Sequence, residues 1–309
     1  MLHVNKLHFY IYYLLSKELH LDYQIISSNR NLCGESPVWM PPQNALYWTD
    51  IDGKLLYIKD FKNNTILSVK MTGRVSCIAP LVSGGFIAAI ENKLIKLDQF
   101  FNNLEVLTEV FPWDSNIRLN DGRADRSGNY FWVGSIFLPR NKKKAGLWRF
   151  SSSGEIKKVV SNITTSNGLS WSPCGNIMYH SDSWSSRIWQ YDYDSSKGEI
   201  SNKKLFFSTN KKQGRPDGAC VDTKGFYWSA CFDGGRLIRI SPNGMLDKEI
   251  QVPMIKPTMV AFGGNEMKTL FITSYGQDLK EPDSKSKECG RVISIQTNIK
   301  GISETLFKI

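Results

Sequence analysis

The chain has 309 residues, of which 41% are apolar and 22% are charged, a composition typical of globular proteins. A chain of this length buries an ample core, so it needs neither disulfides nor a structural metal for stability. The formal net charge is +10, yet the lysine pairs and triplet lie scattered between apolar runs and do not cluster with aromatic residues, which argues against a nucleic-acid partner.

The first twenty residues contain an apolar run, Phe9–Leu15, behind the positively charged Lys6. The run is similar to the apolar region of a signal peptide, but Ser16-Lys17-Glu18 follows where a cleavage site with small residues would stand. It is also too short to span a bilayer. We therefore predict an N-terminal extension of unknown role over residues 1–20, no membrane partner, and a folded domain over residues 21–309.

Six repeats follow, each with a short aromatic or aliphatic run, a polar turn and a second apolar run. They start at Leu46, Phe86, Tyr130, Ile177, Phe226 and Leu270. Successive starts are about 40, 44, 47, 49 and 44 residues apart, a spacing typical of four-stranded propeller blades. Long amphipathic stretches with helical periodicity are absent. The sequence thus predicts an all-β fold, a six-bladed β-propeller with four-stranded antiparallel blades in one domain.

A ring of blades must also be closed. The extended stretch Leu21–Ser27 precedes the first repeat and has no repeat of its own. We predict that it adds a strand to the sixth blade, which would cover two open sheet edges at once.

A polar residue recurs about 9 to 12 positions before each repeat start. The set is Glu35, Ser76, Asn120, Asn167, Asp217 and Thr258. Because the innermost strand of every blade lines the central channel, equivalent positions on these strands should converge on the axis. Carboxylate and amide oxygens are suitable ligands for Ca²⁺, and they also bind Zn²⁺, Mn²⁺ or Fe²⁺. The recurring position of these residues before each repeat start therefore predicts one divalent metal ion on the axis.

Three members of the set admit another interpretation. Asn120, Asn167 and Asp217 each have a glycine one or two residues later, as in the tight turns of β-hairpins. Turns, however, need not recur at a constant distance from the following strands, and an interpretation as turns does not account for Glu35. We favour the ligand interpretation for the set as a whole.

The histidines and cysteines add no competing metal site. His3, His8 and His20 lie in the extension, and His180 falls on a predicted strand, where we expect it to be packed. The six cysteines form no CxxC pair and no Cys/His cluster with zinc spacing. Most lie in or beside apolar segments, as packed, reduced thiols do, so we predict a cytoplasmic protein.

Several motifs resemble those of one known family. They are Gly-Glu-Ser-Pro-Val-Trp at 34–39, Arg-Leu-Asn-Asp-Gly-Arg-Ala-Asp at 118–125, Ser-Asn-Gly-Leu-Ser-Trp-Ser at 166–172, Arg-Pro-Asp-Gly at 215–218, Phe-Asp-Gly-Gly-Arg-Leu-Ile-Arg-Ile at 232–240 and Ala-Phe-Gly-Gly-Asn at 261–265. The family is that of regucalcin (senescence marker protein), gluconolactonase and the luciferin-regenerating enzyme. The resemblance extends over residues 21–309 and all six repeats.

The resemblance implies a site as well as a fold. It implies that Glu35, Asn167 and Asp217 hold the metal, that Arg118 and Asn120 bind the substrate, and that the activity is hydrolysis of aldonolactones. One segment departs from the family pattern: animal members carry a Gly-Thr-Met segment followed by acids, one of which contacts the sugar. Residues 134–140 here hold no acid and end on Arg140, so the sequence leaves the identity of the lactone open.

The mechanism that we expect uses the metal as a Lewis acid on the lactone carbonyl and Asp217 as the general base for the attacking water. Asp121 and Asp182 would support these groups without touching the substrate. Two alternatives remain open: another metal-dependent esterase or phosphotriesterase on the same scaffold, and a calcium-binding propeller that is not an enzyme. We expect a small-molecule lactone as partner and a monomer or weak homo-oligomer.

Overall fold

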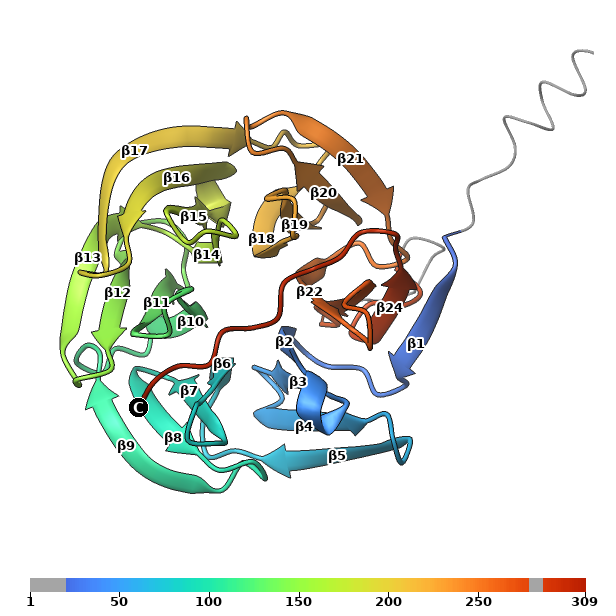
Figure 1. The fold of residues 1–309 in the computed structure, drawn as a ribbon, viewed down its shortest axis with the longest axis horizontal. Coiled ribbons are helices and arrows are strands. Elements are labelled where there is room, and N and C mark those ends of the chain that lie inside the picture. Colours follow the sequence, from blue (N-terminus) through green and yellow to red (C-terminus); the bar gives the residue numbers. More distant parts are fainter. Residues whose placement is uncertain (1–20, 278–285) are drawn as a thin grey trace, which may run out of the picture.

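The computed structural model describes residues 21–277 and 286–309, so the predicted extension over residues 1–20 lies outside the described residues. The chain forms six four-stranded antiparallel sheets arranged as blades around a central axis (Figure 1). The described helices are two short 3₁₀ turns, η1 (Pro41–Gln43) and η2 (Ser183–Ser185). None of the described helices is long and apolar enough to cross a membrane.

The strands run from the axis outward in chain order within blades 1 to 5, whereas the outer edge of blade 6 is β1, the first strand of the chain. Blade 1 has β2 (Gly34–Met40), β3 (Ala45–Asp50), β4 (Leu55–Asp60) and β5 (Thr65–Lys70). Blade 2 has β6 (Val75–Pro80), β7 (Phe86–Ile90), β8 (Lys93–Leu97) and β9 (Asn103–Glu109). Blade 3 has β10 (Ile117–Ala124), β11 (Tyr130–Phe137), β12 (Ala145–Ser151) and β13 (Ile156–Ile163).

The second half of the ring repeats this arrangement. Blade 4 has β14 (Ser166–Trp171), β15 (Ile177–Asp182), β16 (Arg187–Asp194) and β17 (Glu199–Ser208). Blade 5 has β18 (Arg215–Val221), β19 (Tyr227–Phe232), β20 (Arg236–Ile240) and β21 (Leu246–Gln251). Blade 6 has β22 (Pro257–Gly263), β23 (Thr269–Ser274), β24 (Val292–Gln296) and, on its outer edge, β1 (Tyr23–Ser27). The predicted six-bladed all-β propeller is confirmed, and the six predicted repeat starts fall at the second strand of each blade.

The closure of the ring is also as predicted. Strand β1 pairs with β24 in antiparallel register, with Tyr23 opposite Ile295 and Ile25 opposite Ile293. The beginning and the end of the folded chain therefore share one sheet, and the bluest and reddest strands of Figure 1 lie side by side.

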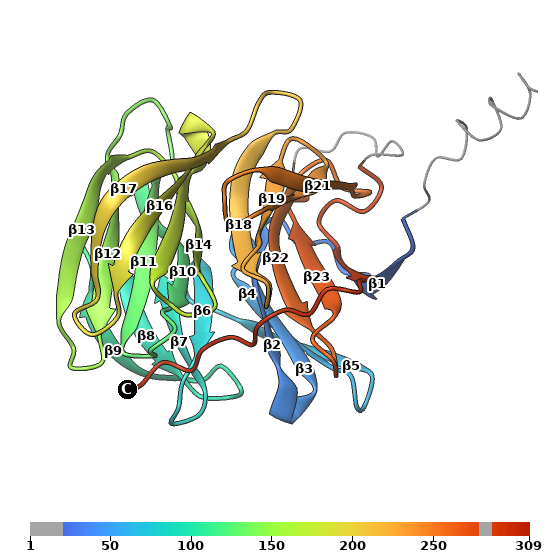
Figure 2. The same cartoon turned by 45° about the horizontal axis from the view of Figure 1, so that its top comes forward.

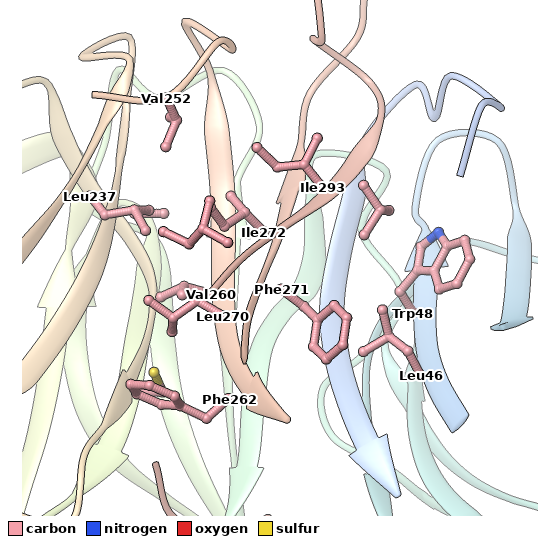
Figure 3. Close-up of a cluster of buried hydrophobic side chains, with 14 of the residues drawn as sticks. Leu46, Trp48, Leu237, Val252, Val260, Phe262, Leu270, Phe271, Ile272 and Ile293 are labelled. Carbon is pink, nitrogen blue, oxygen red and sulfur yellow. The ribbon is translucent and has the colours of Figure 1, made fainter. Parts of the chain in front are cut away.

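The core lies between the blades. Every residue of β3 is buried, because both faces of a central strand pack against neighbouring sheets. The largest cluster joins blades 5, 6 and 1, where Leu237, Phe271 and Trp48 approach from three sheets (Figure 3). The outermost strands are mostly exposed, as in β5, where only Ile66 and Val69 are partly buried.

The C-terminal segment after β24, which we call the strap, crosses the ring at the end where the inner strands finish (Figures 1 and 2). It forms isolated bridges from Gly301 to Asp222 and from Phe307 to Leu81. The Phe307 side chain is fully buried. The Glu304 carboxylate lies 3.1 Å from the Arg123 guanidinium, which projects from β10. The strap thus joins blades 2, 3, 5 and 6 across that end of the propeller.

All six cysteines are free thiols, as expected. Five of them are buried, whereas Cys174 is exposed in the loop between β14 and β15 and is not packed.

Candidate active site

The six polar residues that recur in the sequence all lie on innermost strands. They fall on β2, β6, β10, β14, β18 and β22, one in each blade. The pairing register shifts at or directly beside each of them, so every inner strand has a β-bulge at the same level of the channel. A bulge bends a strand and re-aims a side chain. The repeated bulge is therefore the local device that turns these polar groups toward the axis.

The bulges also explain the glycines that follow three of these residues. Asn120, Asn167 and Asp217 lie within strands, so the alternative interpretation as hairpin turns is wrong. Gly168 adopts a φ of +63°, which L-residues rarely adopt, and a Cβ atom there would stand 2.3 Å from the Tyr227 hydroxyl. A glycine inside a strand marks a bulge and a close approach, and the position after Asn167 requires both.

A pocket of about 280 Å³ opens on the axis where the inner strands begin. Five of the six recurring residues line it, and Ser76 does not; its hydroxyl hydrogen-bonds the Ala89 carbonyl at 3.4 Å. Thr258 also lines the pocket, but its hydroxyl donates a hydrogen bond to the Gly34 carbonyl at 2.5 Å. The hydroxyl proton of Thr258 is therefore already used within the protein. The polar floor therefore consists of Glu35, Asn120, Asn167, Asp217 and the neighbouring Arg118.

These floor residues form a continuous hydrogen-bonded chain. Arg118 Nη1 donates to Asn120 Oδ1 at 2.6 Å, and Asn120 Nδ2 donates to Asn167 Oδ1 at 2.7 Å. Asn167 Nδ2 in turn donates to Asp217 Oδ1 at 2.5 Å and to Ser183 Oγ at 2.8 Å. Three blades are joined in this way, so the side chains are held in fixed orientations before any ligand binds.

The carboxylates of Glu35 and Asp217 lack a counter-charge in direct contact. Neither belongs to a salt bridge among the described residues. Burial raises the pKa values of both groups, that of Asp217 to about 8, and the Asp121 carboxylate adds to both effects. The Asp217 carboxylate further raises the pKa of Glu35. A cation bound in the pocket would stabilise the charged forms of these two buried acids.

The oxygens that face this pocket fit a divalent ion. Within the described residues no three His, Cys, Asp or Glu side chains form a metal-binding group, and the third candidate oxygen ligand is the amide of Asn167. Asn167 Oδ1 accepts one hydrogen bond and keeps a second lone pair. Glu35, Asn167 and Asp217 together thus offer the hard oxygen ligands that Ca²⁺ prefers.

The pKa of Asp217 leads to a pH prediction for the metal-free protein. Between its ordinary value of 3.8 and its folded value of about 8, the native state holds a proton that the unfolded chain has released. The free energy of unfolding therefore falls as the pH rises through this window. Glu35 acts in the same direction because its pKa is also raised. We expect the melting temperature of chelator-treated protein to drop between pH 5 and pH 8.

The Asp217→Asn variant is the matched test, because asparagine has no proton to lose in this range. Its melting temperature should depend less steeply on pH than that of the parent protein. Parallel profiles for the two proteins would show that the pKa of Asp217 is not raised.

Two further acids hold the backbone on either side of Asn167. Asp121 Oδ2 accepts a hydrogen bond from the Leu169 amide at 2.9 Å, and Asp182 Oδ1 accepts one from the Thr165 amide at 3.0 Å. Both therefore fix the backbone next to Asn167. His180 is buried on β15 against Ser166, and burial lowers its pKa to about 3, so it is packed as expected.

The mouth of the pocket holds residues that the sequence reasoning did not identify. Trp184, Phe232 and Tyr275 line it, together with Lys256 and the partly exposed Arg215. From the segment that departs from the family pattern, Ile136, Leu138 and Arg140 contribute an apolar and basic wall. A sequence signal did exist for the two cations, since Arg215 and Lys256 stand two residues before Asp217 and Thr258, as Arg118 stands before Asn120.

The fold and the pocket define a six-bladed β-propeller with an oxygen-lined axial site. The chain belongs to the SMP-30/Gluconolactonase/LRE-like family, whose model matches residues 33–276. It is 34% identical over 278 residues to a 6-deoxy-6-sulfogluconolactonase of Pseudomonas putida, an alignment that covers 90% of this chain and 95% of the relative. Regucalcin of Homo sapiens is 33% identical over 279 residues, which are 88% of this chain and 93% of the relative.

A solved structure agrees with the sequence relatives. A luciferin-regenerating enzyme superimposes with a TM-score of 0.86 at 29% identity, over 94% of this chain and all of that one. The resemblance noted in the sequence is thereby confirmed at the level of the family.

Proposed function

We propose that this protein is a metal-dependent hydrolase that opens a sugar lactone. The observation that carries the proposal is the pocket floor, where two uncompensated carboxylates and an amide oxygen lie beside the hydrogen-bond donors of Arg118 and Asn120. Membership of a family that includes a named gluconolactonase supports the reaction class. The proposed domain over residues 21–309 contains every residue involved.

The metal would be held by Glu35, Asn167 and Asp217. When bound, a divalent ion supplies Lewis-acid polarisation of a carbonyl oxygen. Its identity among Ca²⁺, Zn²⁺, Mn²⁺ and Fe²⁺ depends on availability as well as on these ligands.

The chain's own residues would supply the proton transfers and the orientation. Asp217 takes a proton from the water that attacks the carbonyl carbon, and it returns that proton to the ring oxygen when the C–O bond breaks. Arg118 and Asn120 orient the ring hydroxyls, and the Arg118 charge offsets charge on the developing oxyanion.

The test is lactone hydrolysis by metal-stripped protein to which Ca²⁺, Mn²⁺, Fe²⁺ or Zn²⁺ is added singly. We expect one or more ions to restore turnover, and we expect Glu35→Gln to require a much higher ion concentration because a charged ligand is lost. Metal binding, followed by calorimetry, should weaken in the same variant. Full activity of the stripped protein would overturn the metal dependence.

A second candidate has one observation in its favour. The wall formed by Ile136, Leu138 and the exposed Trp184 is apolar, as in pockets that accept aryl groups. An esterase or phosphotriesterase would use the same floor. A panel of aldonolactones, aryl esters and phosphotriesters separates these activities, and metal binding without turnover of any of them would favour the calcium-binding alternative.

A further inference from the structure

Three basic side chains lie along the mouth of the pocket. Arg140 lies in the loop that follows β11, Arg215 begins β18, and Lys256 precedes β22. All three line the pocket, so blades 3, 5 and 6 each contribute one cation to it. The charges of Arg215 and Arg140 oppose the rise in the pKa of Asp217, which lines the same pocket. We call these three residues the cationic arc.

Aromatic side chains hold two members of the cationic arc in place. The Arg215 guanidinium lies 5.2 Å from the Trp184 ring and 5.3 Å from the Phe232 ring. The Lys256 ammonium lies 5.7 Å from the same Phe232 ring and 5.0 Å from that of Tyr275. Cations stacked on aromatic faces lose mobility and remain available to a ligand on their other side. This arrangement differs from that of ordinary surface lysines, which move freely in solvent.

The charge of the cationic arc is only partly compensated. Arg215 forms a 2.5 Å ion pair with Asp233, whereas Arg140 and Lys256 have no ion pair among the described residues. The other carboxylate at the mouth, Asp52, accepts a hydrogen bond from Gln277 at 3.0 Å on the side of blades 1 and 6. The wall that includes blade 3 therefore keeps a positive charge with no ion-pair partner among the described residues.

Arg140 lies in a tight turn with a left-handed backbone conformation. Its φ is +56°, in the left-handed region that costs a non-glycine residue free energy. The Arg140 amide donates to the Phe137 carbonyl at 2.9 Å, which fixes the turn. A glycine or asparagine would adopt this turn more readily.

We propose that the pocket takes sugar lactones that carry an anionic group, with the ring on the polar floor and the anionic group on the cationic arc at the mouth. The inference rests on the proposed function for the lactone ring. A phosphate, sulfonate or carboxylate on the ring substituent farthest from the carbonyl shares the required chemistry, since each accepts charge-assisted hydrogen bonds from Arg and Lys.

The experiment compares D-glucono-δ-lactone with its 6-phosphate, with rates corrected for spontaneous opening. We expect kcat/KM to be higher for the phosphorylated lactone by about tenfold or more, chiefly through KM, because charge-assisted contacts form in the ground state. Arg140→Gln and Lys256→Gln should each remove most of this preference. Added salt should also reduce it, since exposed charges are screened.

Lys248→Gln provides the matched control, because it removes the same charge from an exposed position on the outer strand β21. It should leave the preference unchanged. Equal values of kcat/KM for the two lactones in the parent protein would overturn the inference while the lactonase proposal stands.

If neither lactone is hydrolysed, the lactonase proposal fails, and calorimetry with gluconate and 6-phosphogluconate still tests the cationic arc. Tighter binding of the phosphate that is lost in Arg140→Gln would support the anionic site on its own. Equal binding of the two acids would reject it.

Discussion

Asp217→Asn is expected to abolish most turnover while the protein stays folded. The change removes the only proposed proton acceptor and one charged ligand of the metal, and loss of a general base alone lowers kcat by about 10²- to 10⁴-fold. Folding should be preserved because an asparagine oxygen can still accept the hydrogen bond from Asn167 Nδ2. In the metal-free protein it should even improve near neutral pH, since the native state no longer has to hold a proton that the unfolded chain releases. Steady-state kinetics and thermal melting measure the two effects separately.

The control for this variant is Asp52→Asn. Asp52 lines the same pocket and undergoes the same chemical change, but it does not belong to the hydrogen-bonded floor. We expect a far smaller loss of kcat. Hydrolysis by Asp217→Asn at the parental rate would show that another group acts as the base.

Deletion of residues 21–28 is expected to unfold the protein. The deletion removes β1, which leaves β24 as an open edge, and it removes Leu21, Tyr23 and Ile26 from the core between blades 6 and 1. A whole domain is stable by only about 5–15 kcal/mol, so the loss of a strand and its apolar contacts takes a large part of the total. We expect insoluble protein or a melting temperature lower by more than about 10 °C.

A pair of point variants tests the same prediction with less disturbance. Ile25 lies in the middle of β1 opposite Ile293, and its side chain is 45% exposed. Ile25→Pro disrupts the strand backbone, whereas Ile25→Ala keeps it and removes only an exposed side chain. The proline variant should therefore melt well below the alanine variant. Similar melting temperatures would indicate that β1 pairing contributes little to ring closure.

The blade architecture could be predicted from the sequence because every blade needs the same pattern of buried and exposed strands. A central strand such as β3, buried on both faces, begins with an apolar and aromatic run, Ala45–Trp48, and such runs recur at the blade spacing. The same regularity placed Glu35, Asn167 and Asp217 on inner strands without any known structure. Closure by β1 followed from the need to cover a sheet edge.

The β-bulges and the residues at the mouth of the pocket could not be predicted as well from the sequence. The glycine after Asn167 was compatible with a hairpin turn, and only the pairing of β14 with β15 shows that it lies inside a strand. Ser76 has the correct phase, yet it does not reach the pocket, because its hydroxyl is satisfied by the backbone of its own blade. Trp184 comes from the loop after β15, and loops follow no repeat from which their position could be inferred.

The strap has a consequence for the passage of small molecules. Its Glu304 pairs with Arg123, whose guanidinium also donates to the Ala219 carbonyl at 2.7 Å, so the strap and Arg123 lie across the channel at that end. We therefore expect substrate and product to pass through the opening at the other end, where they compete for the same pocket. Ring opening creates a new carboxylate, which has to leave past Arg140 and Lys256. The hydrolysed acid is therefore expected to act as a competitive inhibitor that accumulates with turnover.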